Sequence, residues 1–297
     1  LAYTIVVACL WMASPYIAYA VSSDIPKKKY VLDYDEKTYL REISRRIYAY
    51  YEDFINEENN YLAPDNYQVR PYKGVAHRTS PTNMGMGIIS EVAAYDLGYI
   101  TIGEFIDKID LILKNMNDLK REHGHFYNWY DTRTKEPLWP RYISTVDSGN
   151  LLANLWILKK SMEDLKSSPV IRTKEIMALK DIYKIIEKEN SNIQIRFASS
   201  VSIDQYTEIL DEIIEVISTN NELKNIINEL NKPKNSTAHS NINEETKYWV
   251  KKLINEAEKK KEYFNYMFSG MESLFKEDFI EDVPTLKELS KRYAQYK

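Results

Sequence analysis

The chain has 297 residues, with 40 Lys and Arg against 44 Asp and Glu, and its formal net charge is −4. That length can bury a full core, and the charge balance gives no concentrated basic surface for nucleic acid. The single cysteine, Cys9, excludes an internal disulfide and a cysteine metal cluster.

Residues 1–22 form an uncharged, mostly apolar run, LAYTIVVACLWMASPYIAYAVS. Roughly 20 apolar residues span a bilayer, so the run predicts a transmembrane helix. A cleaved signal peptide and a buried core helix are the alternatives, and the missing basic start argues against the first. Lys27, Lys28 and Lys29 follow and indicate that the downstream part is cytoplasmic. Because the first residue is Leu, we expect a piece of a longer protein.

The first soluble helix is predicted over residues 35–56, where apolar residues recur at helical spacing. Three arginines, Arg41, Arg45 and Arg46, fall largely off this stripe and are expected on a solvated face. The stripe that should face the core comprises Leu40, Ile43, Ile47, Tyr50 and Phe54.

Three further helices follow in the first half. Residues 83–97 are apolar on most sides, which indicates a buried helix, with Ser80 or Thr82 as its N-cap. A capping-box pattern at residues 101–104 opens a helix that runs to about residue 120. The last spans residues 150–166, with Asp147 or Ser148 as N-cap.

The second half, residues 167–297, reads as a variable helical region. Amphipathic patterns predict helices over 173–188, 202–219, 244–268 and 285–295, with a polar break at 231–243. Lys and Glu alternate along many faces, which is typical of solvated helices. No motif in this half indicates chemistry.

Two loops interrupt the helices, at residues 59–80 and 123–150, and the second holds two of the five Trp and two of the four His. Flat aromatic faces suit the C–H face of a pyranose ring, and carboxylates and amides suit its hydroxyls. Arginines can donate to hydroxyls or hold the acids in place. The second loop therefore predicts a sugar-binding surface that comprises Phe126, Tyr127, Asn128, Trp129, Asp131, Arg133, Trp139, Arg141, Asp147 and Asn150.

Other interpretations of this loop stay open. It could be an aromatic plug over the core, and Arg133 and Arg141 could be structural partners of the two aspartates. The pair His123 and His125 invites a metal interpretation, but a zinc site needs a third ligand and none is indicated, so we expect no metal. Glycoside chemistry needs two carboxyl groups roughly 5 to 9.5 Å apart. Asp131 and Asp147 are weak candidates for that pair, or they bind substrate.

Three runs resemble a known family: HRTSPTNMGMG, HGHFYNWYDTRTKEPL and RYISTVDSGNLLANLWIL. They look like the membrane-bound cyclic β-1,2-glucan synthases, and LWMASPYIAYAVS resembles the last membrane segment before their middle, glycoamylase-like domain. The resemblance covers residues 1–166. One departure is LLAN at residues 151–154, where the family tends to carry Ala-Gly, which weakens any expectation of close helix packing there.

The resemblance implies an all-α fold in a bacterial inner-membrane protein with a cytoplasmic soluble part. A transmembrane helix (1–22) would precede the first part of an incomplete (α/α)6 toroid (23–166), followed by the helical extension (167–297). The remaining domains of the full-length synthase would use UDP-glucose as donor, and this piece, which carries no cofactor of its own, would bind β-1,2-glucan for cyclisation by transglycosylation. The family's catalytic carboxylates are expected in the half of that domain that lies outside this chain.

Substrate contact, rather than catalysis, is what the resemblance carries onto this sequence. The residues concerned are His125, Tyr127, Asn128, Trp129, Asp131, Arg141, Asp147 and Asn150, and more weakly His77, Arg78 and Asn83. Two other functions remain as alternatives: a glycoamylase-like β-glucan hydrolase, and a non-enzymatic membrane-anchored helical module.

Overall fold

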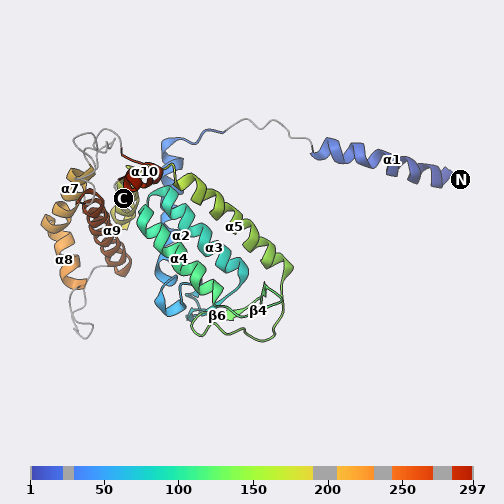
Figure 1. Ribbon diagram of the computed structural model, residues 1–297, viewed down its shortest axis with the longest axis horizontal. Helices are drawn as coiled ribbons and strands as arrows, with labels where there is room; N and C mark the ends of the chain where they lie inside the picture. The colour runs from blue at the N-terminus through green and yellow to red at the C-terminus, as the bar shows by residue number, and fades with distance from the viewer. Residues whose placement is uncertain (1, 23–29, 190–205, 231–242, 270–282, 296–297) are drawn as a thin grey trace. The chain divides into compact units, whose positions relative to one another are not determined.

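The computed structural model describes residues 2–22, 30–189, 206–230, 243–269 and 283–295 (Figure 1). The chain divides into two compact units, Leu1–Thr38 and Tyr39–Lys297. The predicted all-α class is confirmed, because the strands in the described ranges are only two residues long. The predicted division at residues 166 and 167, and the closure of the helices into a toroid, stay predictions.

The first unit holds helix α1, Ala2–Ser22, as predicted. By length and composition α1 could cross a membrane, and none of its side chains is buried. Such a helix alone is weak evidence of a span, since signal sequences pass the same test. The flanking lysines, Lys27 to Lys29, lie outside the described residues.

Four helices form the first half of the second unit: α2 (Tyr34–Phe54, which begins in the first unit), α3 (Pro81–Leu97), α4 (Ile102–Asn117) and α5 (Thr145–Leu165). Helix α3 packs against both α4 and α5. Its N-cap is Ser80, with Pro81 in the first turn. The capping box of Thr101 and Glu104 is confirmed. The predicted N-terminal signals of α3 and α4 are therefore both present in the structure.

Helices α3 and α5 approach closely at Gly85. A Cβ at this position would come too close to Asn154 Nδ2, so a larger residue would force that side chain to move. The expectation that the LLAN departure weakens close packing is therefore wrong, since Asn154 of that same run fills the contact.

Three antiparallel strand pairs gather at one end of these helices, where Figure 1 shows β4 and β6. The 3-10 helix η1 (Glu57–Asn59) precedes the first pair. The pairs are β1 (Tyr67–Gln68) with β2 (Gly74–Val75), β3 (Arg78–Thr79) with β6 (Tyr130–Asp131), and β4 (Arg121–Glu122) with β5 (His125–Phe126). The β3–β6 pair joins the two predicted loops, which are far apart in sequence.

The second half contributes α6 (Lys174–Glu189), α7 (Tyr206–Thr219), α8 (Asn221–Leu230), α9 (Glu244–Ser269) and α10 (Leu286–Gln295). Helices α6, α7 and α8 all pack on α9 and share one apolar core. Helix α8 was not predicted. The polar break over residues 231–242 and the predicted helix start at residues 202–205 lie outside the described part.

The start of α5 differs from the prediction. The helix begins at Thr145 and its N-cap is Ser144, whose side chain accepts from the backbone N–H of Asp147. The predicted start at residue 150, with Asp147 or Ser148 as cap, is therefore wrong. The first turns carry few apolar residues, so the hydrophobic periodicity used to place the start was absent there.

The buried face of α2 is also not the predicted one. The helix buries Arg45, Tyr48 and Ala49, whereas Leu40 and Ile47 of the predicted apolar stripe are exposed. The expectation that the arginines are solvated is wrong, most clearly for Arg45, which is 1% exposed.

The partners of Arg45 come from three helices or their connections. Its Nη2 lies 2.9 Å from Glu52 Oε2. The guanidinium carbon lies 5.6 Å from the ring centre of Tyr48 and 5.4 Å from those of Tyr99 and Trp249. Burial of this charge is tolerated because a carboxylate and three aromatic faces surround it.

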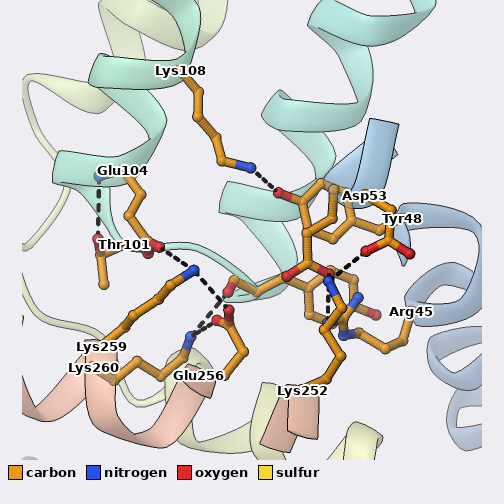
Figure 2. Close-up of polar contacts among 12 residues, drawn as sticks. Arg45, Tyr48, Asp53, Thr101, Glu104, Lys108, Lys252, Glu256, Lys259 and Lys260 are labelled. Atoms are coloured by element: carbon orange, nitrogen blue, oxygen red, sulfur yellow. Dashed lines mark hydrogen bonds and ion pairs between the residues drawn. The ribbon is translucent and has the colours of Figure 1, made fainter. Parts of the chain in front are cut away.

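Lysines of α9 extend this polar network across the two halves (Figure 2). Lys252 Nζ lies 2.7 Å from Asp53 Oδ1 and 3.0 Å from Glu52 Oε2 on α2. Lys260, fully buried, donates to the backbone oxygen of Tyr99 at 2.9 Å and to Glu256 Oε2 at 3.0 Å. Lys252 and Lys260 therefore link α9 to α2 and to the segment that follows α3.

Candidate functional site

The two loops that the sequence singled out meet at the strand end of the helices. Arg78 pairs with Asp131 in the β3–β6 register. The backbone N–H of Thr132 donates to the oxygen of His77 at 3.1 Å. The side-chain amide of Asn60 donates at 2.8 Å to the backbone oxygens of both Thr132 and Arg133. The two predicted loops are therefore joined by backbone and side-chain hydrogen bonds into one region at this end of the helices.

Asp147 lies in the first turn of α5, where a carboxylate interacts favourably with the positive end of the helix dipole. Its Oδ1 accepts from the hydroxyl of Thr82 at 2.6 Å, and Asn150 Nδ2 donates to that hydroxyl at 3.1 Å. Partial burial opposes ionisation, but hydrogen bonds from Ser144 and Thr82 outweigh it, so the pKa of Asp147 lies below its ordinary value. This carboxylate is therefore an ionised hydrogen-bond acceptor.

Asn128 connects Asp147 to the second loop. In the orientation of its amide that satisfies every neighbour, the nitrogen donates to Asp147 Oδ2 at 3.0 Å. The amide oxygen then accepts from the Tyr142 hydroxyl at 2.7 Å and from Trp129 Nε1 at 2.8 Å. Since Asn128 is buried, this network fixes its orientation.

A second polar group surrounds Asp65, which the sequence interpretation missed. Asp65 Oδ2 accepts from Arg78 Nε at 3.0 Å and Nη2 at 2.7 Å, and its Oδ1 accepts from Asn83 at 3.2 Å. The guanidinium carbon of Arg78 lies 4.7 Å from the ring centre of Trp129. Asp65 therefore binds two of the predicted site residues, Arg78 and Asn83, and reaches Trp129 only through Arg78. Its only sequence signal was a Pro-Asp-Asn turn, which is common in loops.

His77 is tied to the scaffold. Its Nδ1 lies 2.8 Å from Asn59 Oδ1, the same oxygen that accepts from the Thr132 hydroxyl at 2.7 Å. Its Nε2 lies 3.8 Å from Glu58 Oε1. Because Asn59 is buried, His77 fixes the junction of the two loops.

Asp131 closes a turn. Its Oδ1 accepts from the backbone N–H groups of Arg133 and Thr134, both at 2.9 Å. Partial burial opposes ionisation, but these N–H groups and the Arg133 charge outweigh it, so the pKa of Asp131 lies below its ordinary value. The suggested structural pairing with Arg133 is present as a 3.9 Å contact. Its Oδ1 is therefore occupied by its own turn, while Oδ2 lies toward Arg133.

The remaining predicted residues lie toward the edge of the site. His125 is exposed on β5, and the Tyr127 hydroxyl donates to Glu122 at 2.9 Å. Arg141 lies with its guanidinium carbon 5.8 Å from the Trp139 ring centre, and the ion pairs within residues 30–189 do not join it to Asp147. Among the described residues, no cluster of three or more His, Cys, Asp or Glu suits a metal ion.

The site is thus a surface of fixed donors and acceptors beside aromatic rings. Its central members are ionised or amide side chains held by each other and by helix α5. Such an array can hydrogen-bond a ligand that carries many hydroxyls without further reorganisation.

Comparison with curated proteins finds a relative for about half of the chain. Over 163 residues, 54% of its length, the chain is 36% identical to the cyclic β-(1,2)-glucan synthase NdvB of Rhizobium meliloti. The resemblance found in the sequence is confirmed. The chain spans only 6% of the length of this glucan synthase.

Two other comparisons were with family models and with solved structures. No family model matches the sequence. A solved structure of a candidate glucoamylase from Bacteroides fragilis is 19% identical, with a TM-score of 0.38 over 55% of this chain and 38% of that one.

Proposed function

We propose that this chain is the glucan-binding part of a membrane-bound cyclic β-1,2-glucan synthase, in which it holds β-1,2-glucan for cyclisation by transglycosylation. The observation that carries the proposal is the Asp147 network at the junction of the two loops. Thr82, Asn128 and Asn150 all lie in or beside runs that resemble the family, and all hydrogen-bond within that network.

The proposed ligand follows from the chemistry of the network. Sugar hydroxyls both donate and accept, and the network presents an ionised carboxylate, amides and a hydroxyl in fixed positions. Asp131 and Asp147 would bind the sugar rather than act as the general acid of glycoside chemistry, because a general acid needs a raised pKa and both of theirs are lowered. The catalytic carboxylates would belong to other parts of the full-length protein.

An exposed apolar face on α5 supports a larger assembly. Val146, Leu152, Trp156 and Ile157 are each exposed on this helix, and exposed apolar side chains that gather on one element can mark a protein–protein contact. Remaining domains of the synthase would cover it. Those domains would also use UDP-glucose, and α1 would anchor the chain in the inner membrane with the soluble part in the cytoplasm.

Product analysis tests the enzyme class. The purified chain would be incubated with linear β-1,2-glucan, alone and with the remaining domains of its full-length protein supplied. Mass spectrometry distinguishes a ring from a linear chain of equal length because closure without hydrolysis leaves the ring lighter by one water. Rings formed with the domains supplied would support the synthase, whereas short linear glucans alone would support the hydrolase and contradict the proposal.

Asp65 should matter for this binding although it was not predicted. Replacing Asp65 with Ala should weaken β-1,2-glucan affinity about tenfold, because Arg78 and Asn83 lose their common acceptor. Isothermal titration calorimetry measures the change. Asp65→Asn keeps an acceptor oxygen and should lose less. Equal affinities of Asp65→Ala and the unsubstituted chain would show that the residues held by Asp65 do not contact the ligand.

A further inference from the structure

The two tryptophans of the second loop have different environments. Trp129 is half-buried, with the Arg78 guanidinium over its ring at 4.7 Å and its Nε1 donating to the Asn128 amide at 2.8 Å. Trp139 is 83% exposed. Although both were expected to offer aromatic faces, Trp129 already has its ring and its N–H engaged by the scaffold.

The exposed position of Trp139 is held at both ends. The residue before it, Leu138, donates its backbone N–H to the oxygen of Trp129 at 2.9 Å. Three residues after it, the backbone oxygen of Tyr142 accepts from the N–H of Asn128 at 2.8 Å. Residues 138–142 therefore form a segment, called here the bridge, whose two ends are hydrogen-bonded to residues 128 and 129. Trp139 is exposed within this held segment and not at a frayed end.

The bridge also places Trp139 next to the polar network. Three residues of extended chain span at most about 10 Å, so the Cα of Trp139 lies within that distance of the Cα of Tyr142. The Tyr142 hydroxyl reaches the Asn128 amide, which donates to Asp147. The indole ring is therefore close enough for a ligand that binds Asp147 and extends along residues 138–142 to reach it.

An indole that protrudes from such a bridge suits a sugar ring. Its flat apolar face can cover the C–H face of a pyranose, and burial of that surface is favourable. Arg141, with its guanidinium 5.8 Å from the ring centre, adds donors for the hydroxyl rim of the same sugar.

We propose that Trp139 forms an outer stacking subsite, which binds a glucose unit beyond those held by the Asp147 network. The inference rests on the proposed function and deepens it. It attributes the preference for longer over shorter glucans to the Trp139 side chain. Trp129, in turn, has a positioning role, because it holds Arg78 and Asn128.

The test compares the affinities of a disaccharide and a longer β-1,2-linked oligosaccharide by calorimetry. The full chain would be kept in a zwitterionic, sugar-free detergent, because glycoside detergents would compete. The unsubstituted chain should bind the longer ligand more tightly. Trp139→Ala should lose about tenfold in affinity for the longer ligand and retain its affinity for the disaccharide.

The matched control is Trp156→Ala, which removes another exposed indole, 73% exposed on α5 outside the bridge. It should leave both affinities unchanged. The subsite would be overturned if Trp139→Ala kept the length preference, if it lost disaccharide binding equally, or if Trp156→Ala reproduced its effect. No binding of either ligand by the unsubstituted chain would contradict the proposed function itself, and the subsite with it.

Discussion

Replacing Lys260 with Met should lower the free energy of unfolding by about 3–5 kcal/mol, the usual cost of removing one partner from a buried ion pair. Lys260 is fully buried, and its loss leaves Glu256 and the backbone oxygen of Tyr99 without this donor. Thermal unfolding followed by circular dichroism would measure the loss as a melting temperature reduced by many degrees.

The control is the next residue of the same helix. Lys261 pairs with Asp211, but these side chains are 41% and 57% exposed, so Lys261→Met should change little. Replacing Lys260 with Met and Glu256 with Leu together should recover part of the stability, because no buried charge is then left unpaired. Equal melting temperatures for the two single variants would show that the network does not fasten α9.

The pH dependence provides an independent readout of the same variant. Burial opposes ionisation of Glu256, but Lys260, Lys259 and Arg45 outweigh it, so the pKa of Glu256 is lowered from its ordinary 4.5. A lowered pKa contributes stability that is present above the ordinary value and lost as pH falls below it. Lys260 makes the largest of these contributions that lower the pKa of Glu256. The stability of Lys260→Met should therefore fall less steeply with acid than that of the unsubstituted chain.

Replacing Asp147 with Ala should weaken β-1,2-glucan binding roughly 10- to 100-fold, the cost of charged hydrogen bonds worth about 1.5–3 kcal/mol. The substitution removes the acceptor of Thr82 and Asn128, so the orientation of both donors is lost together with the carboxylate. The fold should survive, since a carboxylate in the first turn contributes only about 0.3–1 kcal/mol to the helix.

Asp164→Ala is the matched control for this variant. Asp164 is an exposed aspartate near the other end of α5, where it pairs with Lys160. The Asp164→Ala variant should bind glucan with the same affinity as the unsubstituted chain. If Asp147→Ala also bound unchanged while retaining its helical content, the site would not lie at the Asp147 network.

Local signals explain what the sequence predicted correctly. The capping box of Thr101 and Glu104 and the Ser80-Pro81 start each lie within four residues, and the structure confirms both. The runs around Arg78, Asn128 and Asp147 were assigned to one site from local chemistry and resemblance, and the structure brings these residues into one continuous set of contacts.

Long-range partners explain what the sequence could not predict. Arg45 was expected in solvent because its aromatic neighbour Trp249 lies 204 positions away, and no local pattern links the two. Asp65 was missed because its turn motif is common and its partners lie on other elements. The early start of α5 was missed because Ser144 caps turns that lack apolar periodicity.

The central claim is that the junction of the two loops binds β-1,2-glucan, and a direct binding measurement tests it. The full chain in sugar-free detergent would be titrated with β-1,2-linked and with β-1,3-linked glucan of matched length. We expect saturable binding of the β-1,2-linked glucan, weaker binding of the other, and loss of the preference in Asp147→Ala. Equal binding of the two glucans, or none of either, would contradict the account.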